Sequence, residues 1–232
     1  LFTERMATDS GKTELDYAIS LKMVLELREI KVSEITGAII GSVVPPVTSL
    51  MREAIRKVTG QEALVVHVDM NIGLEVLMDN PSSVGTDLIV GAVAGINRYP
   101  VPLILIDMGT ATTICVVNEN KQYIGGMILP GIGVSMNSLT SRTAQLPRIS
   151  LDPPKRLIGK NTVECMQSGA LYGNASCIDG MVDRIEEELG QKATVVATGG
   201  LARKIIPLCR HQIELDDELL LRGLWIIYKK NK

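Results

Sequence analysis

The chain has 232 residues, a formal net charge of −2 and 46% hydrophobic residues, so it can bury the core of one large or two small domains. Basic residues are scattered apart from three lysines at the end, and aromatic residues make up 3%, which disfavours a nucleic-acid-binding surface. No stretch approaches the ~20 uninterrupted apolar residues of a membrane span, and no secretory leader is visible. We therefore expect a cytoplasmic protein that binds neither nucleic acid nor membrane.

The cysteine and histidine patterns exclude several kinds of site. The four cysteines show no C-x-x-C spacing, so we expect buried thiols and no zinc site. The two histidines accompany no nucleophile motif, which disfavours Ser-His-Asp or Cys-His catalysis.

In the first hundred residues, short apolar runs alternate with helical patterns. The expected elements are an extended segment at 2–8, a helix at 15–30 capped by Asp9 and Ser10, a buried strand at 35–44, a helix at 47–58, a strand at 63–68, an irregular segment at 69–80 and a helix at 85–99. The last helix is apolar all round, which indicates burial in a core or at an interface.

The second half begins with three strands separated by tight turns. The strands are expected at 103–106, 112–117 and 123–129, followed by a helix at 133–144, a loop-rich stretch at 146–160, a long helix at 162–189, a strand at 192–197, a short helix and an amphipathic helix at 215–230. This alternation predicts an α/β fold with a mixed sheet in each half and helices outside. We divide it into residues 1–100 and 101–232, with a ligand between the halves near the carboxyl ends of the strands.

A polar turn follows the first strand of the second half. Asp107, Gly109 and Thr110 form a D-x-G-T motif, in which the glycine lets a ligand approach the backbone and the threonine can bind a phosphate oxygen. The aspartate can hold a hydrated cation or orient a nucleophile. An ordinary hairpin turn uses the same residue types, so the motif alone leaves both interpretations open.

Nine segments, taken together and in order, resemble the type III pantothenate kinases of the acetate and sugar kinase, Hsp70 and actin superfamily. They are SVVPP at 42–46, DNPSSVGTD at 79–87, IDMGTATT at 106–113, GGMILPG at 125–131, LPR at 146–148, GKNTVECMQSGALYG at 159–173, IDG at 178–180, ATGGLA at 197–202 and LLLRGLWIIY at 219–228. The resemblance implies two actin-like (ribonuclease H-like) subdomains with the ligand cleft between them. It also implies phosphorylation of the primary hydroxyl of pantothenate, the first step of coenzyme A biosynthesis, with ATP, Mg²⁺ and a monovalent cation (K⁺ or NH₄⁺).

The same resemblance assigns the acceptor side of the site. Asp87 would be the general base that takes the proton of the acceptor hydroxyl, and Gly85, Thr86, Leu88 and Thr162 would contact pantothenate. From the residues alone, a capping carboxylate near a helix N-terminus is the simpler interpretation of Asp87. A helix cap is likewise the simpler interpretation of Thr162, with the preceding asparagine as a rival cap.

The resemblance also assigns the nucleotide side. Gly109 and Thr110 would bind phosphate, Gly199 and Gly200 would face the nucleotide, and Asp107 would be the ligand of the monovalent cation. A plain strand-to-helix turn also explains the two later glycines.

By the same resemblance the protein is a homodimer with the acceptor site at the subunit interface. Residues 125–131 would shape the backbone beside that interface, and residues 89–96 and 127–136 would pack against the second subunit. An ordinary core is the alternative.

Two departures from the family pattern bear on activity. The family's first phosphate loop, D-x-G-N-T, has no counterpart after Leu1, and we expect it upstream. Leu88 stands where the family has arginine, Thr86 replaces alanine, and residues 67–73 also differ. A lost charge-assisted contact costs about 1.5–3 kcal/mol. Two further hypotheses are therefore a degenerate paralogue that binds nucleotide or regulates without turnover, and a kinase for another alcohol.

Overall fold

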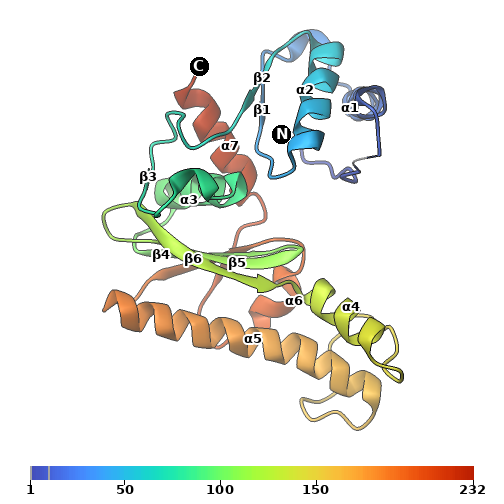
Figure 1. The fold of residues 1–232 in the computed structure, drawn as a ribbon, viewed down its shortest axis with the longest axis vertical. Helices are drawn as coiled ribbons and strands as arrows, with labels where there is room; N and C mark the ends of the chain where they lie inside the picture. The colour runs from blue at the N-terminus through green and yellow to red at the C-terminus, as the bar shows by residue number, and fades with distance from the viewer. Residues whose placement is uncertain (1, 10) are drawn as a thin grey trace.

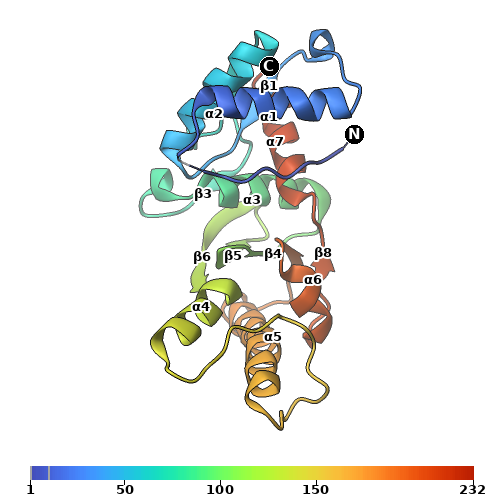
Figure 2. The same cartoon turned by 90° about the vertical axis from the view of Figure 1, so that its right-hand side faces the viewer.

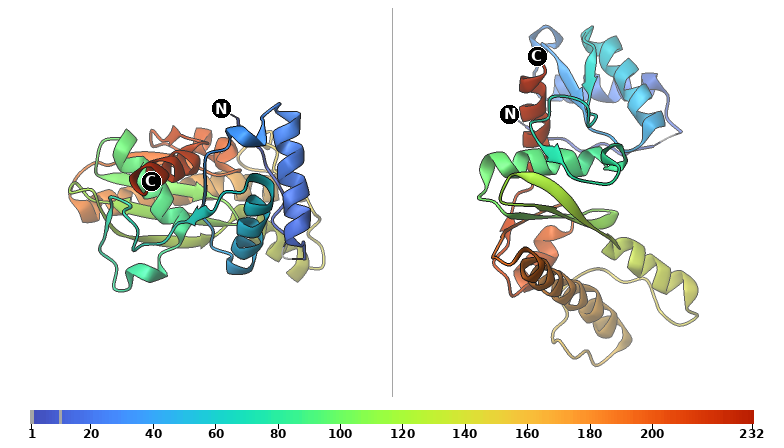
Figure 3. Two further views of the ribbon diagram at one scale, coloured as in Figure 1. Left: turned by 90° about the horizontal axis from the view of Figure 1, so that it is seen from above. Right: turned by 60° about the vertical axis from the view of Figure 1, so that its left-hand side comes forward.

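The protein is described from a computed structural model over residues 2–9 and 11–232, and its elements are stacked in layers along one long axis (Figure 1). A six-stranded sheet lies in the middle. The long helix α5 (Thr162–Leu189) covers one face, and α3 (Thr86–Arg98) and α7 (Leu219–Lys230) lie on the other. Beyond them stands a smaller unit made of α1 (Glu14–Leu27), α2 (Pro45–Thr59), β1 (Ala38–Ile40) and β2 (Ala63–Val65). The right-hand view of Figure 3 shows the same order from another side.

Local sequence signals define the ends of the helices in the smaller unit. Thr13 and Asp16 form a capping box at the start of α1, so the expectation that Asp9 caps this helix was wrong, and Ser10 lies outside the described residues. Helix α2 begins at Pro45, a position where the backbone N–H that proline is missing would have no partner within the helix. Gly60, in the left-handed conformation, caps its C-terminus. The N-terminal segment, expected to be extended, has no regular secondary structure and passes beside α1 (Figure 2).

The strands of the smaller unit are shorter than expected. Strand β1 covers only Ala38–Ile40 of the expected 35–44, because the chain turns at Ser42, whose hydroxyl accepts a hydrogen bond from the Val44 amide at 3.1 Å. Strands β1 and β2 pair in parallel, so the described strands here do not form the expected mixed sheet. The expected irregular segment 69–80 contains strand β3 (Glu75–Val76).

The six-stranded sheet is mixed and contains the predicted meander. Its order is β3-β6-β5-β4-β7-β8, with β4 (Leu103–Met108), β5 (Ala111–Val117), β6 (Gln122–Pro130), β7 (Thr194–Thr198) and β8 (Glu214–Leu215). Strands β4, β5 and β6 are antiparallel neighbours, whereas β7 runs parallel to β4. The carboxyl ends of β4 and β7 therefore lie side by side at one edge of the sheet. Strand β8 occupies the start of the expected last helix, so α7 begins only at Leu219.

The remaining helices frame the lower part of the molecule. Helix α4 (Ile132–Arg142) follows β6 directly, and α6 (Ala202–Ile205) follows the turn after β7. Short 3₁₀ turns lie at Val32–Glu34, Pro81–Ser83 and Ile206–Leu208. None of the helices in the described part of the chain has the length and hydrophobicity needed to cross a membrane.

Two apolar clusters pack on the two faces of the six-stranded sheet. One joins the sheet to α3 and α7, and the other joins it to α5. Every residue of 89–96 is buried within the chain itself, so the expectation that this segment packs on a second subunit was wrong and the core alternative holds. Helix α7 approaches α3 so closely that a Cβ atom on Gly223 would lie 2.0 Å from the carbonyl oxygen of Val90. Helix α7 belongs to the second half of the chain, yet it packs on α3 of the first half. The division into residues 1–100 and 101–232 therefore stays a prediction.

Candidate active site

A small cavity lies between the six-stranded sheet and the first turns of α3 and α7. Its volume is about 20 Å³, enough for roughly one water molecule. Asp87 and Asp107 both line it, the first from α3 and the second from β4. The two carboxylates that the family resemblance assigns to the acceptor and to the cation therefore face one space.

The start of α3 positions Asp87. Gly85 precedes the helix, and Asp87 lies in the first turn, where the helix dipole favours a negative charge. The Thr86 hydroxyl donates a hydrogen bond to the Ser42 carbonyl at 2.9 Å and so ties this turn to the loop after β1. Oδ1 of Asp87 accepts a hydrogen bond from the Leu88 amide at 2.9 Å. The carboxylate is thus held at the helix end with its other oxygen uncommitted among the described residues.

Asp107 is the penultimate residue of β4 and is half-buried. Burial raises the pKa of Asp107, and the negative charge of Asp87 raises it further. No described residue donates a hydrogen bond to its side chain. A half-buried carboxylate that receives no hydrogen bond from the described residues is destabilising unless a cation or solvent compensates it, so the environment of Asp107 suits a cation ligand.

The predicted phosphate turns lie next to Asp107. A Cβ atom on Gly109 would be 3.7 Å from Oδ1 of Asp107, and one on Gly199 would be 2.5 Å from the same atom. The Thr110 carbonyl accepts a hydrogen bond from the Gly131 amide at 3.1 Å, and a Cβ atom on Gly131 would clash with that carbonyl at 2.2 Å. Gly109, Thr110 and Gly200 are exposed. The two turns that follow β4 and β7 therefore share one edge of the site.

Thr162 is not part of this group. It lies exposed in the first turn of α5, on the opposite side of the sheet from α3 (Figure 1). The helix cap is the rival residue, Asn161, whose side chain accepts a hydrogen bond from the Glu164 amide at 2.9 Å. Within one chain, the fold does not bring Thr162 close to Asp87. The assignment of Thr162 to the acceptor therefore stays a prediction.

Three cavity residues were missed in the sequence analysis. Thr113 on β5 and Thr198 on β7 line the cavity on either side of Asp107, and Cys115 on β5 also lines it. Burial raises the pKa of Cys115 to about 12, with a contribution from the two carboxylates, so this thiol stays protonated near neutral pH. The signal in the sequence that could have indicated Thr198 is its position directly before the Gly199–Gly200 pair.

Leu88 also lines this cavity, together with Leu219 and Leu220 of α7. The place at which the family resemblance predicts an arginine is therefore occupied by one of several apolar side chains. The acceptor side of the cavity is apolar, and its charge comes from the two aspartates alone.

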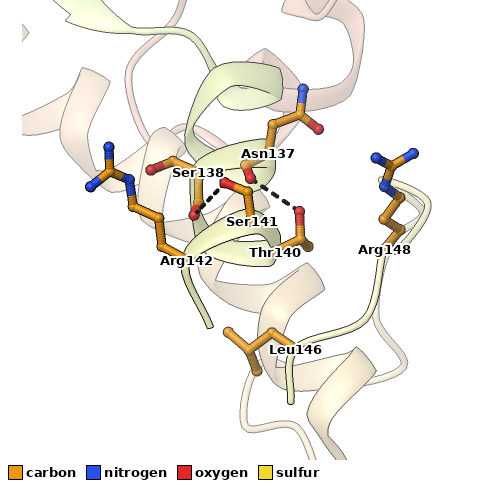
Figure 4. Close-up of a pocket in the computed structure, with 7 residues that line it drawn as sticks. All are labelled: Asn137, Ser138, Thr140, Ser141, Arg142, Leu146 and Arg148. Carbon is orange, nitrogen blue, oxygen red and sulfur yellow. Dashed lines mark hydrogen bonds between the residues drawn. The ribbon is translucent and has the colours of Figure 1, made fainter. Parts of the chain in front are cut away.

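A wider polar pocket of about 580 Å³ lies between α4 and the loop that follows it (Figure 4). Arg142 and Arg148 flank it, and two of the hydroxyls between them already donate to backbone carbonyls, Thr140 to Asn137 at 3.1 Å and Ser141 to Ser138 at 3.3 Å. None of the sequence-predicted site residues lines this pocket. Its size alone does not make it the centre of the chemistry.

A group of potential metal ligands lies on the far side of the sheet. Asp183, Glu186 and His211 place ligand atoms within 4.8 Å of one another. Both Glu186 oxygens are already engaged, one with the Lys192 ammonium at 2.6 Å and the other with the Ala193 amide at 3.1 Å. An ion pair within the protein thus satisfies this carboxylate.

Comparison with known proteins places the chain in a family. A sequence profile described as Type III pantothenate kinase matches residues 1–184. The type III pantothenate kinase of Bacillus cytotoxicus is 44% identical over 227 residues, which cover 98% of this chain and 87% of that protein.

Two solved structures share the fold. A conserved Campylobacter jejuni protein assigned to the Baf family of transcriptional activators has a TM-score of 0.57 at 19% identity, covering 90% of this chain and 88% of that one. Component A of the (R)-2-hydroxyglutaryl-CoA dehydratase of Acidaminococcus fermentans has a TM-score of 0.50 at 13% identity, covering 93% and 85%. At these identities the likeness concerns the fold alone, and it confirms the predicted actin-like α/β class. On the sequence matches, this chain is a kinase that belongs to the type III pantothenate kinase family.

Proposed function

We propose that this chain transfers the terminal phosphoryl group of ATP to the primary hydroxyl of pantothenate, the first step of coenzyme A biosynthesis, with Asp87 as the general base. The family supports the reaction, and one structural observation supports the residue. Asp87 and Asp107 line the same cavity from different elements, at the edge where the turns after β4 and β7 meet. An alcohol oxygen beside Asp87 would there lie close to a phosphate held beside Asp107.

Asp87 has the properties that the proposed proton transfer requires. Asp87 lies in the first turn of α3, where the helix dipole favours the negative charge of a carboxylate. An ionised carboxylate within hydrogen-bond reach of an alcohol orients it and accepts its proton as the phosphoryl group moves. Phosphoryl transfer depends mainly on such positioning and on charge neutralisation.

The nucleotide side would be formed by the two turns. Gly109, Thr110, Gly199 and Gly200 would present backbone to the phosphates, since the glycines leave space for close approach. Asp107 fits a hard cation because its oxygens receive no hydrogen bond from the described residues. We propose that it holds K⁺ or NH₄⁺ directly or through water and that Mg²⁺ accompanies ATP. Bound cations would neutralise phosphate charge at this edge.

We further propose a homodimer located in the cytoplasm, with the acceptor site completed at the interface by Gly85, Thr86, Leu88 and Thr162. Two observations support a second copy against β6. Ile128 is 77% exposed and Ile124 is 37% exposed on this strand, whose only outer neighbour among the described strands is the two-residue β3. An exposed apolar edge strand is a surface that proteins usually cover. The free cysteines agree with a reducing compartment.

The test is phosphate transfer from ATP to pantothenate by the protein as the cell makes it, with Mg²⁺ and K⁺. Asp87→Asn should lower kcat by a factor of about 10²–10⁴, the usual contribution of a general base, while the circular dichroism spectrum stays unchanged. Asp69→Asn is the matched control, because Asp69 is exposed and lies outside the cavity. Turnover of Asp87→Asn within twofold of wild type would remove Asp87 from the mechanism.

Leu88 supports a second candidate, a kinase-shaped protein without pantothenate turnover. Its apolar side chain lines the cavity at the place of the family's arginine, so the cavity offers no fixed cation to a carboxylate-bearing acceptor. Nucleotide binding without transfer to pantothenate would select this candidate. Transfer to another alcohol in a screen of small alcohols would instead select a kinase of altered acceptor.

A further inference from the structure

The loop after β1 contains a carbonyl group that its own neighbours cannot satisfy. Ser42 is followed, three and four residues on, by Pro45 and Pro46. The amides at these two positions are the ones that would bond to the Ser42 carbonyl in a turn or a helix. Proline has no backbone N–H, so neither position can donate. The Ser42 carbonyl is therefore open to a donor from elsewhere in the chain.

Thr86 supplies that donor from a distant segment. Its hydroxyl donates to the Ser42 carbonyl at 2.9 Å, across 44 residues of sequence and in a partly buried position, where the loop after β1 reaches α3 (Figure 1). No other described residue donates to this carbonyl. Val43 of the same loop packs beside the contact, because a Cβ atom on Gly85 would lie 3.6 Å from its Cγ1 atom. The loop thus contacts the two residues that precede Asp87.

The first turn of α3 is held less firmly than the rest of the helix. Its N-cap, Gly85, has no side chain to bind the free amides of the turn. The hydrogen bond from the Ile89 amide to the Gly85 carbonyl is 3.2 Å long, and full burial of the helix begins only at Ile89. The Thr86 hydroxyl therefore tethers the turn that carries Asp87.

We propose that Thr86 is a positioning residue for phosphoryl transfer, which keeps the Asp87 carboxylate at the cavity by tying its helical turn to the Ser42 carbonyl. This inference rests on the proposed role of Asp87 as the base and adds the residue that fixes its place. A base must lie within hydrogen-bond reach of the alcohol, and a displacement of about 1 Å can cost roughly a hundredfold in rate. Because the Thr86 proton is given to Ser42, it is not available to an acceptor at the same time.

Amide hydrogen exchange tests the tether without any substrate. Thr86→Val keeps the branched shape and removes the hydroxyl, so the Ile89 amide should exchange at least about tenfold faster than in wild type. The Tyr99 amide at the other end of α3, bonded to the Gly95 carbonyl at 2.9 Å, should keep its protection. Thr86→Ser keeps the hydroxyl and should restore slow exchange. Unchanged exchange of Ile89 in Thr86→Val would overturn the tether.

Steady-state kinetics test the consequence for the base. Thr86→Val should lower kcat by about ten- to hundredfold and leave the KM for pantothenate nearly unchanged, because the hydroxyl acts on Asp87 and not on the bound acceptor. Thr86→Ser should turn over near the wild-type rate. A raised KM with an unchanged kcat would overturn the inference and make the hydroxyl an acceptor contact.

Thr48→Val is the matched control. The Thr48 hydroxyl donates at 3.0 Å to the Val44 carbonyl of the same loop, within the first turn of α2, and does not reach α3. Its loss should leave kcat and the exchange of α3 amides as in wild type. If Thr86→Val does not fold, Thr86→Ala removes the same hydroxyl with a smaller side chain and serves in its place.

A double variant separates this inference from the proposed function. In Asp87→Asn there is no base to position, so adding Thr86→Val should lower kcat by less than about twofold. A further tenfold loss would mean that Thr86 does not act through Asp87 and would overturn the inference. Full turnover of Thr86→Val beside a strongly impaired Asp87→Asn would overturn the inference alone. Full turnover of Asp87→Asn, or no turnover in wild type, would overturn both.

Discussion

A Cβ atom on Gly199 would lie 2.5 Å from Oδ1 of Asp107 and 2.6 Å from the amide nitrogen of Met108. Gly199 also has a φ of +97°, a backbone conformation that residues with a side chain rarely adopt. The turn after β7 can therefore pass beside the Asp107 carboxylate only because it carries no side chain there. This contact links the proposed nucleotide-facing turn directly to the proposed cation ligand, so a change in one should be felt by the other.

Gly199→Ala should reduce both stability and ATP binding. The added methyl group would meet Asp107 and the Met108 backbone, and the strained φ alone costs about 1–3 kcal/mol. Urea unfolding and the KM for ATP measure the two effects. The control is Gly173→Ala in α5, where a Cβ atom would meet nothing within 4 Å and alanine favours the helix. Equal behaviour of the two variants would show that the Gly199 contact is unimportant.

The sequence predicted the parts of the fold in which local pattern and packing agree. The meander of β4, β5 and β6, the long helix α5 and the helix over 86–98 follow from runs of apolar or β-branched residues bounded by turns. The ends of elements were harder to predict. The turn after β1 at Ser42 and the turn before α7 at Asp216 depend on side-chain hydrogen bonds that sequence periodicity does not reveal.

The site was only partly predictable for a related reason. The D-x-G-T motif and the family resemblance named Asp107 and Asp87, and the fold brings both to one cavity. Thr113 and Thr198 reach it through strand register, which depends on how distant segments pair and is not written in any one segment. The roles of Gly85, Thr86 and Thr162 depend on an acceptor and a second subunit and stay predictions.

Asp107→Asn should change the pH dependence of stability in the absence of added cation. Burial, assisted by the charge of Asp87, raises the pKa of Asp107 above its ordinary value of 3.8, so the folded protein binds this proton more tightly than the unfolded chain does. Stability therefore falls as pH rises from about 3.8 through the raised pKa. Asparagine carries no such charge. The free energy of unfolding of Asp107→Asn minus that of wild type should thus grow with pH between 4 and 7. A difference that stays constant over this range would contradict a destabilising charge on Asp107.

Asp216 should contribute to the pH dependence of stability with the opposite sign to Asp107. Burial opposes its charge, but hydrogen bonds from Tyr99 at 2.9 Å and Arg222 at 2.8 Å outweigh it and lower the pKa of Asp216. This stabilisation is present above the ordinary carboxylate pKa and is lost as pH falls through the lowered value. Asp216→Asn should cost about 2–3 kcal/mol near pH 7, below the ~3–5 of a fully buried pair because the Arg222 side chain is 35% exposed. Urea unfolding should show the loss shrinking below pH 4.

Ile128→Glu should dissociate the proposed homodimer. Ile128 is 77% exposed on β6, and a buried charge at an apolar interface is strongly unfavourable. Light scattering coupled to size exclusion should give the mass of one chain for this variant and of two for wild type. Leu27→Glu on α1 is the control, because Leu27 is equally exposed, at 78%, but lies on the smaller unit away from β6. A dimer that survives Ile128→Glu would place the interface elsewhere.

Leu88→Arg tests whether the apolar residue weakens the acceptor side. Leu88 is half-buried in the cavity beside Asp87, so an arginine there could pair with the two aspartates and with a carboxylate on the acceptor. A charge-assisted contact of about 1.5–3 kcal/mol corresponds to a ten- to hundredfold lower KM for pantothenate. The KM for ATP should change much less, because Leu88 lies on the acceptor side. Leu88→Met keeps the volume without the charge and should leave both constants near wild type. If Leu88→Arg instead raises the KM for pantothenate, the apolar cavity is adapted to this acceptor as it stands, and the kinase has replaced the family's ionic contact with burial.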